Sequence, residues 1–194
     1  LMDEIKRRTA VVRSVLDAKV AIPQIIGVEL CYLQFRLICE LISVACLTAH
    51  GDIPGARAKR LTKSYHADNI LRSLEALHPS FYPRPGRQVH DSSGKVVRLV
   101  DIDEPFLTKS ELQRLYGECG NTLHRGSLDS ILKGNKQPSF ADIEQWLKKI
   151  TKLLNHHQIQ LSGPDWQLWV IMQAKSDGRV HATQFLRMGD ASST

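Results

Sequence analysis

Residues 25–48 read IIGVELCYLQFRLICELISVACLT and are almost continuously hydrophobic. A stretch of this length also meets the requirement for a membrane-spanning helix. Its charged and polar members argue against a membrane span, because charges in hydrocarbon are costly; they are Glu29, Gln34, Arg36 and Glu40. We therefore predict a central helix that begins at Pro23, ends near His50 before Gly51, and is covered by other helices on most sides.

The charged residues of this helix fall on one narrow stripe. At 100° per residue, Arg36 and Glu40 each lie within about 20° of Glu29, with Tyr32 and His50 beside them. Arg36 and Glu40 are four residues apart and can form an ion pair. Two interpretations stay open: a structural ion pair at the edge of a core helix, or a functional polar groove lined by these side chains.

Four further helices are expected around the central one. Hydrophobic periodicity places them at about residues 3–20, 56–78, 108–124 and 139–158. The helix after Thr108 has the strongest local signature, because Thr108 and Glu111 make a capping box and Leu107 and Leu112 a hydrophobic staple.

Two β-hairpins complete the predicted fold. A short one is expected within residues 87–101 and a longer one from Trp166 to Met188, with Val170 opposite Phe185. The predicted fold class is mainly α, a bundle of about five helices. Its parts are a bundle at 1–160 with the hairpin insertion at 87–101, a C-terminal hairpin at 161–188 packed on the bundle, and a flexible tail at 189–194.

Composition indicates a folded intracellular protein. The chain is 42% hydrophobic and 24% charged, which is typical of globular domains. Three of its four cysteines share the central helix at spacings that forbid pairing, so we expect reduced core thiols. We find no signal-peptide pattern near the N-terminus and predict a cytoplasmic location, with no membrane association. A net charge of +6 allows a nucleic-acid partner.

A basic run is the first candidate binding site. Arg57, Lys59, Arg60 and Lys63 lie at the start of the helix predicted for 56–78, where phosphate groups are favoured. Together with Arg125 they are the candidate nucleic-acid-binding residues. The competing interpretation is a solvated surface of that helix.

A second candidate site lies at the end of the helix predicted for 108–124. Asn121 and His124 share a helix face with Gly117 and Gly120, where we expect another helix or a ligand to approach closely. His124 and Arg125 either complement the negative end of the helix dipole or contact an anionic oxygen. Adjacent His156 and His157 point about 100° apart, so we predict no metal site there, and no cofactor motif is present.

The arrangement of several helices, with Arg36 and Glu40 on the central one and YGECGNTLHRG at 116–126, resembles the HEPN superfamily. The resemblance covers at most residues 1–160. It implies a small helical bundle, often dimeric, in RNA-cleaving toxins and antiviral defence. Active members carry an arginine four to six residues before a histidine in one helix. That motif is missing before His124, although similar spacings occur at Arg60 to His66 and Arg72 to His78.

Three functions follow as hypotheses. The first is a helical module that binds RNA or a protein partner, in a toxin or defence setting and with a homodimer as the expected assembly. The second is a metal-independent ribonuclease that uses Arg36, Glu40, Asn121 and His124, which requires these side chains to share one cleft. The third is a protein-interaction domain with a large apolar surface at the C-terminal hairpin.

Overall fold

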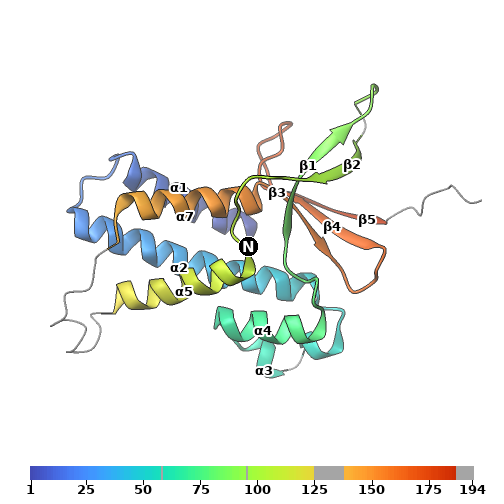
Figure 1. Ribbon diagram of the computed structural model, residues 1–194, viewed down its shortest axis with the longest axis horizontal. Coiled ribbons are helices and arrows are strands. Elements are labelled where there is room, and N and C mark those ends of the chain that lie inside the picture. The colour runs from blue at the N-terminus through green and yellow to red at the C-terminus, as the bar shows by residue number, and fades with distance from the viewer. Residues whose placement is uncertain (58, 95, 125–137, 187–194) are drawn as a thin grey trace, which may run out of the picture.

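The computed structural model describes residues 1–57, 59–94, 96–124 and 138–186, with the backbone alone at residue 60 (Figure 1). Its helices are α1 (Met2–Leu16), α2 (Gln24–Ala49), the 3-10 turn η1 (Pro54–Arg57), α3 (Lys59–Thr62), α4 (Ala67–Leu77), α5 (Lys109–Leu123) and α7 (Phe140–Leu154). Its strands are β1 (Arg84–His90), β2 (Val96–Asp101), β3 (His156–Gln160), β4 (Trp166–Ile171) and β5 (His181–Leu186).

Helix α2 lies at the centre of the helical part, as predicted. α1, α4, α5 and α7 all contact it, and α5 runs alongside it in the opposite direction (Figure 1). Phe35, Ile38 and Cys39 of α2 are fully buried, and Cys39 Sγ lies 4.0 Å from the Leu112 carbonyl oxygen of α5. α2 is long and apolar enough to cross a membrane by length and composition, but half of its most apolar window is buried inside the protein, as in a core helix. All four cysteines are buried and free.

The prediction of a mainly α fold is wrong. The structure is about 52% helix and 18% strand, and its five strands form one curled antiparallel sheet, so the fold is mixed α/β. The strand order is β2-β1-β3-β4-β5, which joins the two predicted hairpins through β3. The contact between β1 and β3 pairs Arg84 with Gln158 and Pro85 with His157. The predicted boundary after residue 160 therefore falls between two strands of this sheet.

Strand β3 replaces the end of the helix predicted for 139–158. α7 begins at Phe140 with the Ser139–Asp142 capping box and ends at Leu154. Beyond it, His157 and Ile159 are buried while their neighbours are half-exposed. This alternation has the two-residue period of a strand, and five residues of such a pattern are too few to separate from a helix by periodicity.

The helix predicted for 56–78 is also wrong, because this segment folds back on itself. η1 and α3 are short turns, and only α4 is a regular helix. The fold-back is tight, since a Cβ atom at Gly55 would lie 2.7 Å from Leu77. It lets Ala56 and Leu61 enter the core together with the buried face of α4, which a single straight helix would prevent.

The C-terminal hairpin exists, but its predicted register is wrong. Gln167, and not Val170, lies opposite Phe185, and the connection between β4 and β5 spans residues 172–180. Met172 and Ala174 are buried in this connection, and the Met172 amide donates to the Asn155 carbonyl after α7. These tertiary contacts outweigh the two-residue turn that the local sequence favours.

His50 ties the end of α2 to the sheet. The side chain is fully buried, with Nδ1 2.8 Å from the Cys46 carbonyl oxygen and Nε2 2.9 Å from that of Gln160. One ring therefore bridges the last turn of α2 and the end of β3, and it sets where the chain leaves the helix at Gly51.

His157 predicts an acid sensitivity of the fold. Burial lowers the pKa of His157 from 6.5 to about 4, and its Nδ1 lies 2.9 Å from the Leu154 carbonyl oxygen. Between these pH values the unfolded chain binds a proton that the folded chain does not, so the free energy of unfolding decreases as pH falls. The loss is on the order of 3 kcal/mol. We expect urea unfolding at neutral pH and near pH 4 to show that the free energy of unfolding decreases less for His157→Gln than for the wild type.

The matched control is His90→Gln, which removes an exposed histidine from the end of β1. It should retain the full acid sensitivity. An identical pH dependence in the wild type and His157→Gln would contradict the assignment.

Candidate nucleic-acid interface

Arg36, Glu40 and Tyr116 form one connected group, which we call the Arg36 cluster. Arg36 Nε lies 3.4 Å from Glu40 Oε1, so the predicted ion pair between them is present. The Tyr116 hydroxyl, from α5, accepts from Arg36 Nη2 at 3.2 Å and donates to Glu40 Oε1 at 3.1 Å. The guanidinium also lies 4.8 Å from the centre of the Tyr116 ring. A charge-assisted network therefore joins α2 to α5.

The Arg36 cluster lies at the edge of the core. The side chains of Arg36 and Glu40 are about one-quarter and one-fifth exposed, whereas Tyr116 is buried. Burial, followed by the negative charge of Glu40, raises the pKa of Tyr116 to about 12. The phenol is therefore neutral at physiological pH and is able to donate its hydrogen bond.

Two aromatic side chains lie next to the Arg36 cluster. His66, just before α4, meets the Tyr116 ring edge-on with ring centres 6.4 Å apart. Tyr65 stacks on His66 at 5.1 Å and is 66% exposed. A flat aromatic surface is therefore presented to solvent beside a half-buried guanidinium.

Asn121 and His124 lie further along α5. Both are exposed, and no hydrogen bond or ion pair with another described residue joins either one to Arg36 or Glu40. Gly120 is the residue of this face that approaches Arg36, since a Cβ there would lie 3.8 Å from Nη1. A Cβ at Gly117 would meet no atom within 4 Å, so this part of the glycine face is open. His124 follows Gly120 by one turn, about 6 Å along the axis.

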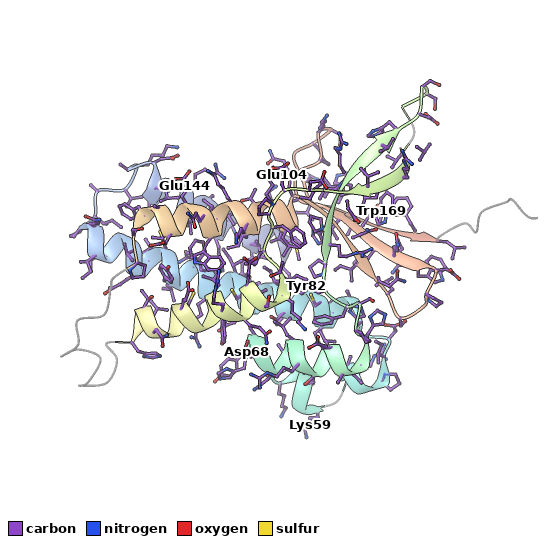
Figure 2. All side chains as sticks on the ribbon, viewed as in Figure 1. Lys59, Asp68, Tyr82, Glu104, Glu144 and Trp169 are labelled. Carbon is purple, nitrogen blue, oxygen red and sulfur yellow. The ribbon has the colours of Figure 1, made fainter. Side chains whose placement is uncertain are left out.

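The predicted basic residues lie on η1 and α3 and in the turn after them. We call residues 57–63 the basic turn. Arg57, Lys59 and Lys63 are exposed, and Lys59 points away from the protein (Figure 2). Among the residues that the structure describes, no carboxylate lies within 4.0 Å of these three cations, although the Ser162 hydrogen bond and the charge of Arg57 both help to lower the pKa of Asp52. Residues 53–66 contain four cations and no acid. The side chain of Arg60 and the whole of Arg125 lie outside the described residues.

The helix N-terminus expected to support phosphate binding here is absent, because α3 has only four residues. The cations of the basic turn therefore act through their own charge. After Ser64 they are followed by Tyr65 and His66, which brings positive charge and an exposed aromatic ring into one surface segment.

Three residues of this site were not predicted from the sequence, namely Tyr116, Tyr65 and His66. Tyr116 has the helical spacing of the core residues of α5, so the local sequence does not distinguish it from a residue that only packs in the core. Tyr65 and His66 were assigned to the interior of a helix that does not form. The adjacent aromatic pair after a run of cations was the available signal.

No protein-family model matches the chain, and comparison with curated proteins and with solved structures finds no similar protein. The HEPN resemblance and the homodimer therefore stay predictions. The apolar surface expected on the C-terminal hairpin has a counterpart in Trp166, Phe185 and Leu186, which are exposed. No partner for it is identified.

Tyr116→Phe tests the Arg36 cluster. The change removes the hydroxyl that joins Arg36 to Glu40 and should lower the free energy of unfolding by about 1 kcal/mol at neutral pH. The wild type should also lose stability as pH rises from 10 to about 12, because only the unfolded chain releases the Tyr116 proton in that range. Tyr116→Phe should lose less stability over this pH range than the wild type, as measured by thermal unfolding.

Tyr65→Phe is the matched control, since Tyr65 is exposed and its hydroxyl bonds to no other described residue. It should unfold like the wild type at every pH. Equal alkaline losses in the wild type and Tyr116→Phe would contradict the role given to this hydroxyl.

Proposed function

We propose that the protein binds single-stranded RNA in the cytoplasm through the basic turn and the Tyr65–His66 pair. The observation that carries the proposal is the close succession of exposed, unpaired cations and an exposed stacked ring in residues 57–66. Lysine and arginine neutralise backbone phosphates, and aromatic rings stack on unpaired bases.

The exposed aromatic ring beside the basic turn supports RNA over an acidic protein partner. Some cations elsewhere on the protein are paired within it, as Lys109 is with Glu75 and Lys149 with Glu111, whereas others form no ion pair with a described residue. Among the described side chains, the basic turn forms no ion pair, and Tyr65 follows it in the sequence with an exposed ring. Stacking on a planar base makes use of that ring, whereas a carboxylate-rich peptide does not.

The test is fluorescence anisotropy of a labelled oligouridine of about ten nucleotides at low and at physiological salt. The wild type should bind, with an affinity that decreases steeply as salt rises. Lys59→Gln/Lys63→Gln should weaken binding and lower the slope of log K against log salt by about 2. Tyr65→Ala should cost about 1–3 kcal/mol of binding free energy and leave that slope nearly unchanged.

Lys148→Gln/Lys175→Gln is the control with the same change in net charge, made at exposed positions away from the basic turn. It should bind almost as the wild type does. If both double variants lose the same affinity, binding depends on net charge alone and this surface is not the site. If the wild type does not bind at low salt, the proposal fails.

A metal-independent ribonuclease is the second candidate function. It is favoured by one observation: His66 lies beside the Arg36 cluster, which already gathers a guanidinium, a carboxylate and a neutral phenol. A histidine can act as general base on an RNA hydroxyl while a guanidinium stabilises the phosphate charge.

Incubation of end-labelled RNA with saturating protein and EDTA tests this second function. Cleavage should decrease by roughly 100-fold or more in Arg36→Gln. The same decrease is expected in either His66→Ala or His124→Ala, and the variant that shows it identifies the general base. RNA that stays intact while it is fully bound would leave binding as the function and rule out cleavage.

A further inference from the structure

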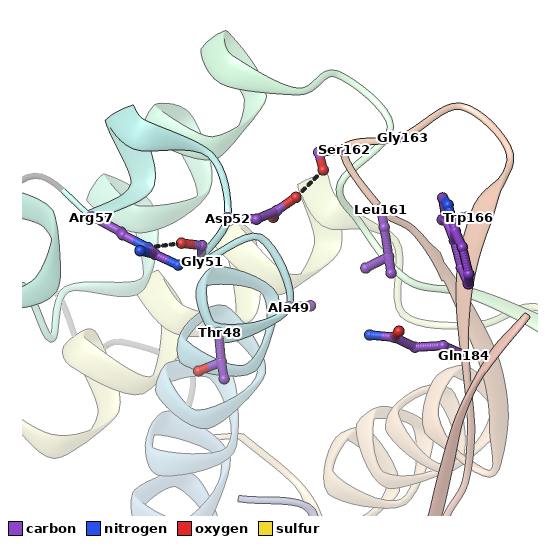
Figure 3. Close-up of a pocket in the computed structure, with 10 residues that line it drawn as sticks. All are labelled: Thr48, Ala49, Gly51, Asp52, Arg57, Leu161, Ser162, Gly163, Trp166 and Gln184. Atoms are coloured by element: carbon purple, nitrogen blue, oxygen red, sulfur yellow. Dashed lines mark hydrogen bonds between the residues drawn. The ribbon is translucent and has the colours of Figure 1, made fainter.

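An open cavity lies between the C-terminal end of α2 and strands β4 and β5 (Figure 3). Its volume is about 440 Å³, within the range of small-ligand pockets. Two segments far apart in the sequence line it, namely residues 48–57 and residues 161–184. Arg57 belongs both to this cavity and to the basic turn, so the cavity adjoins the surface to which we assign RNA binding.

Trp166 forms an aromatic wall of the cavity. Its side chain is 44% exposed, which is unusual for so large an apolar group. The turn before it allows this position, because a Cβ at Gly163 would lie only 3.0 Å from Trp166 Cδ1. The indole therefore rests against a turn that has no side chain there, and it leaves a ring surface available for stacking.

Asp52 supplies a carboxylate opposite this wall. The Ser162 hydroxyl donates to Asp52 Oδ2, which holds the side chain at the rim between the end of α2 and the turn before β4 (Figure 3). That hydrogen bond lowers the pKa of Asp52, so the group is ionised at neutral pH. An ionised carboxylate has about four acceptor positions, of which Ser162 occupies one. Two neighbouring donors of a ligand can still bind.

Gln184 and Arg57 provide donors around the same space. The Gln184 amide points from β5 toward the end of α2 (Figure 3). It has no hydrogen-bond partner among the described residues. Arg57 uses Nε to donate to the Gly51 carbonyl, which orients the guanidinium and leaves its terminal amino groups without a described partner. The cavity thus combines a stacking ring, an anionic acceptor, an amide and a cation.

We infer that this cavity binds a guanine base of single-stranded RNA, an assignment that rests on the proposed function. Trp166 stacks on the base, Asp52 accepts from N1–H and N2–H₂, the Gln184 amide donates to the base oxygen O6, and Arg57 contacts the adjoining phosphate. Residues 57–66 then bind the flanking nucleotides.

Guanine is the base that matches this donor and acceptor set. Its Watson–Crick edge offers two adjacent donors, which one carboxylate accepts together, and an acceptor beside them. Uracil offers a single ring N–H between two oxygens, so the Asp52 charge would lie against an acceptor. Adenine and cytosine each offer one amino group next to a bare ring nitrogen, which the carboxylate repels.

The test compares two labelled RNAs in anisotropy titrations, oligouridine and the same oligouridine with one central guanosine. The guanosine should increase the affinity of the wild type about tenfold or more, which is typical of one well-matched base contact. Asp52→Asn should remove this preference, so that the variant binds the two RNAs with equal affinity. Replacing guanosine by inosine, which lacks the N2 amino group, should lower the preference in the wild type.

Asp165→Asn is the matched control, because it removes an exposed negative charge next to Trp166 that does not line the cavity. It should retain the guanosine preference. Gly163→Ala should displace Trp166 and reduce the preference, while its melting temperature reports whether the fold is retained.

The outcomes separate the two proposals. If the wild type binds both RNAs equally, the cavity is not a guanine site, but RNA binding stands. A preference that persists in Asp52→Asn overturns the role of Asp52 and with it this assignment. If neither RNA binds, the proposed function fails and the cavity assignment fails with it.

Discussion

The burial of α2 is the constraint on which the rest of the structure depends. An apolar helix of 26 residues is stable in water only if other elements cover it on almost every side. α1, α4, α5 and α7 supply that cover over most of its length, while Ile25, Ile26 and Leu33 stay exposed. The charged stripe is then left at the edge of the core, where Arg36 is paired with Glu40 and bonded to Tyr116. The Arg36 cluster is a consequence of this arrangement, because a half-buried arginine and carboxylate each require a partner.

The C-terminal end of α2 determines where the sheet begins. His50 contacts the Cys46 carbonyl within the helix and the Gln160 carbonyl at the end of β3. Phe81, fully buried beside it, comes from the segment that leads into β1. Helices and sheet therefore share one core at this point. The curled sheet lies at the end of the helical part where α2 and α7 finish (Figure 1).

Local signals predicted the helices whose ends are determined by their own residues. α2 begins after Pro23 and ends before Gly51, and α5 begins with the Thr108–Glu111 capping box, all as expected. The errors occur where distant contacts decide the structure. β3 forms because β1 and β4 pair with it, and its five residues carry no turn or cap signal of their own. The fold-back at Gly55 depends on Leu77, more than twenty residues away.

In the candidate site, too, local sequence predicted some features while distant contacts determine the others. The Arg36–Glu40 pair was predictable from a spacing of four on one helix. Its partner Tyr116 comes from a helix 80 residues later, and helical periodicity alone indicates only that Tyr116 faces the core. The charge of the basic turn was predictable from composition, but its exposure next to Tyr65 follows from the break between α3 and α4.

The cavity at the end of α2 was beyond prediction for a geometric reason. Asp52 and Ser162 are 110 residues apart and meet because His50 holds the end of α2 against the end of β3. Gln184 faces the same space only in the observed register, in which it lies opposite Leu168. In the register expected from a two-residue turn, Gln184 would shift along β4 by three residues and its side chain would leave this face of the sheet. The contacts of Met172 and Ala174 that displace the turn are therefore also what brings the Gln184 amide into the cavity.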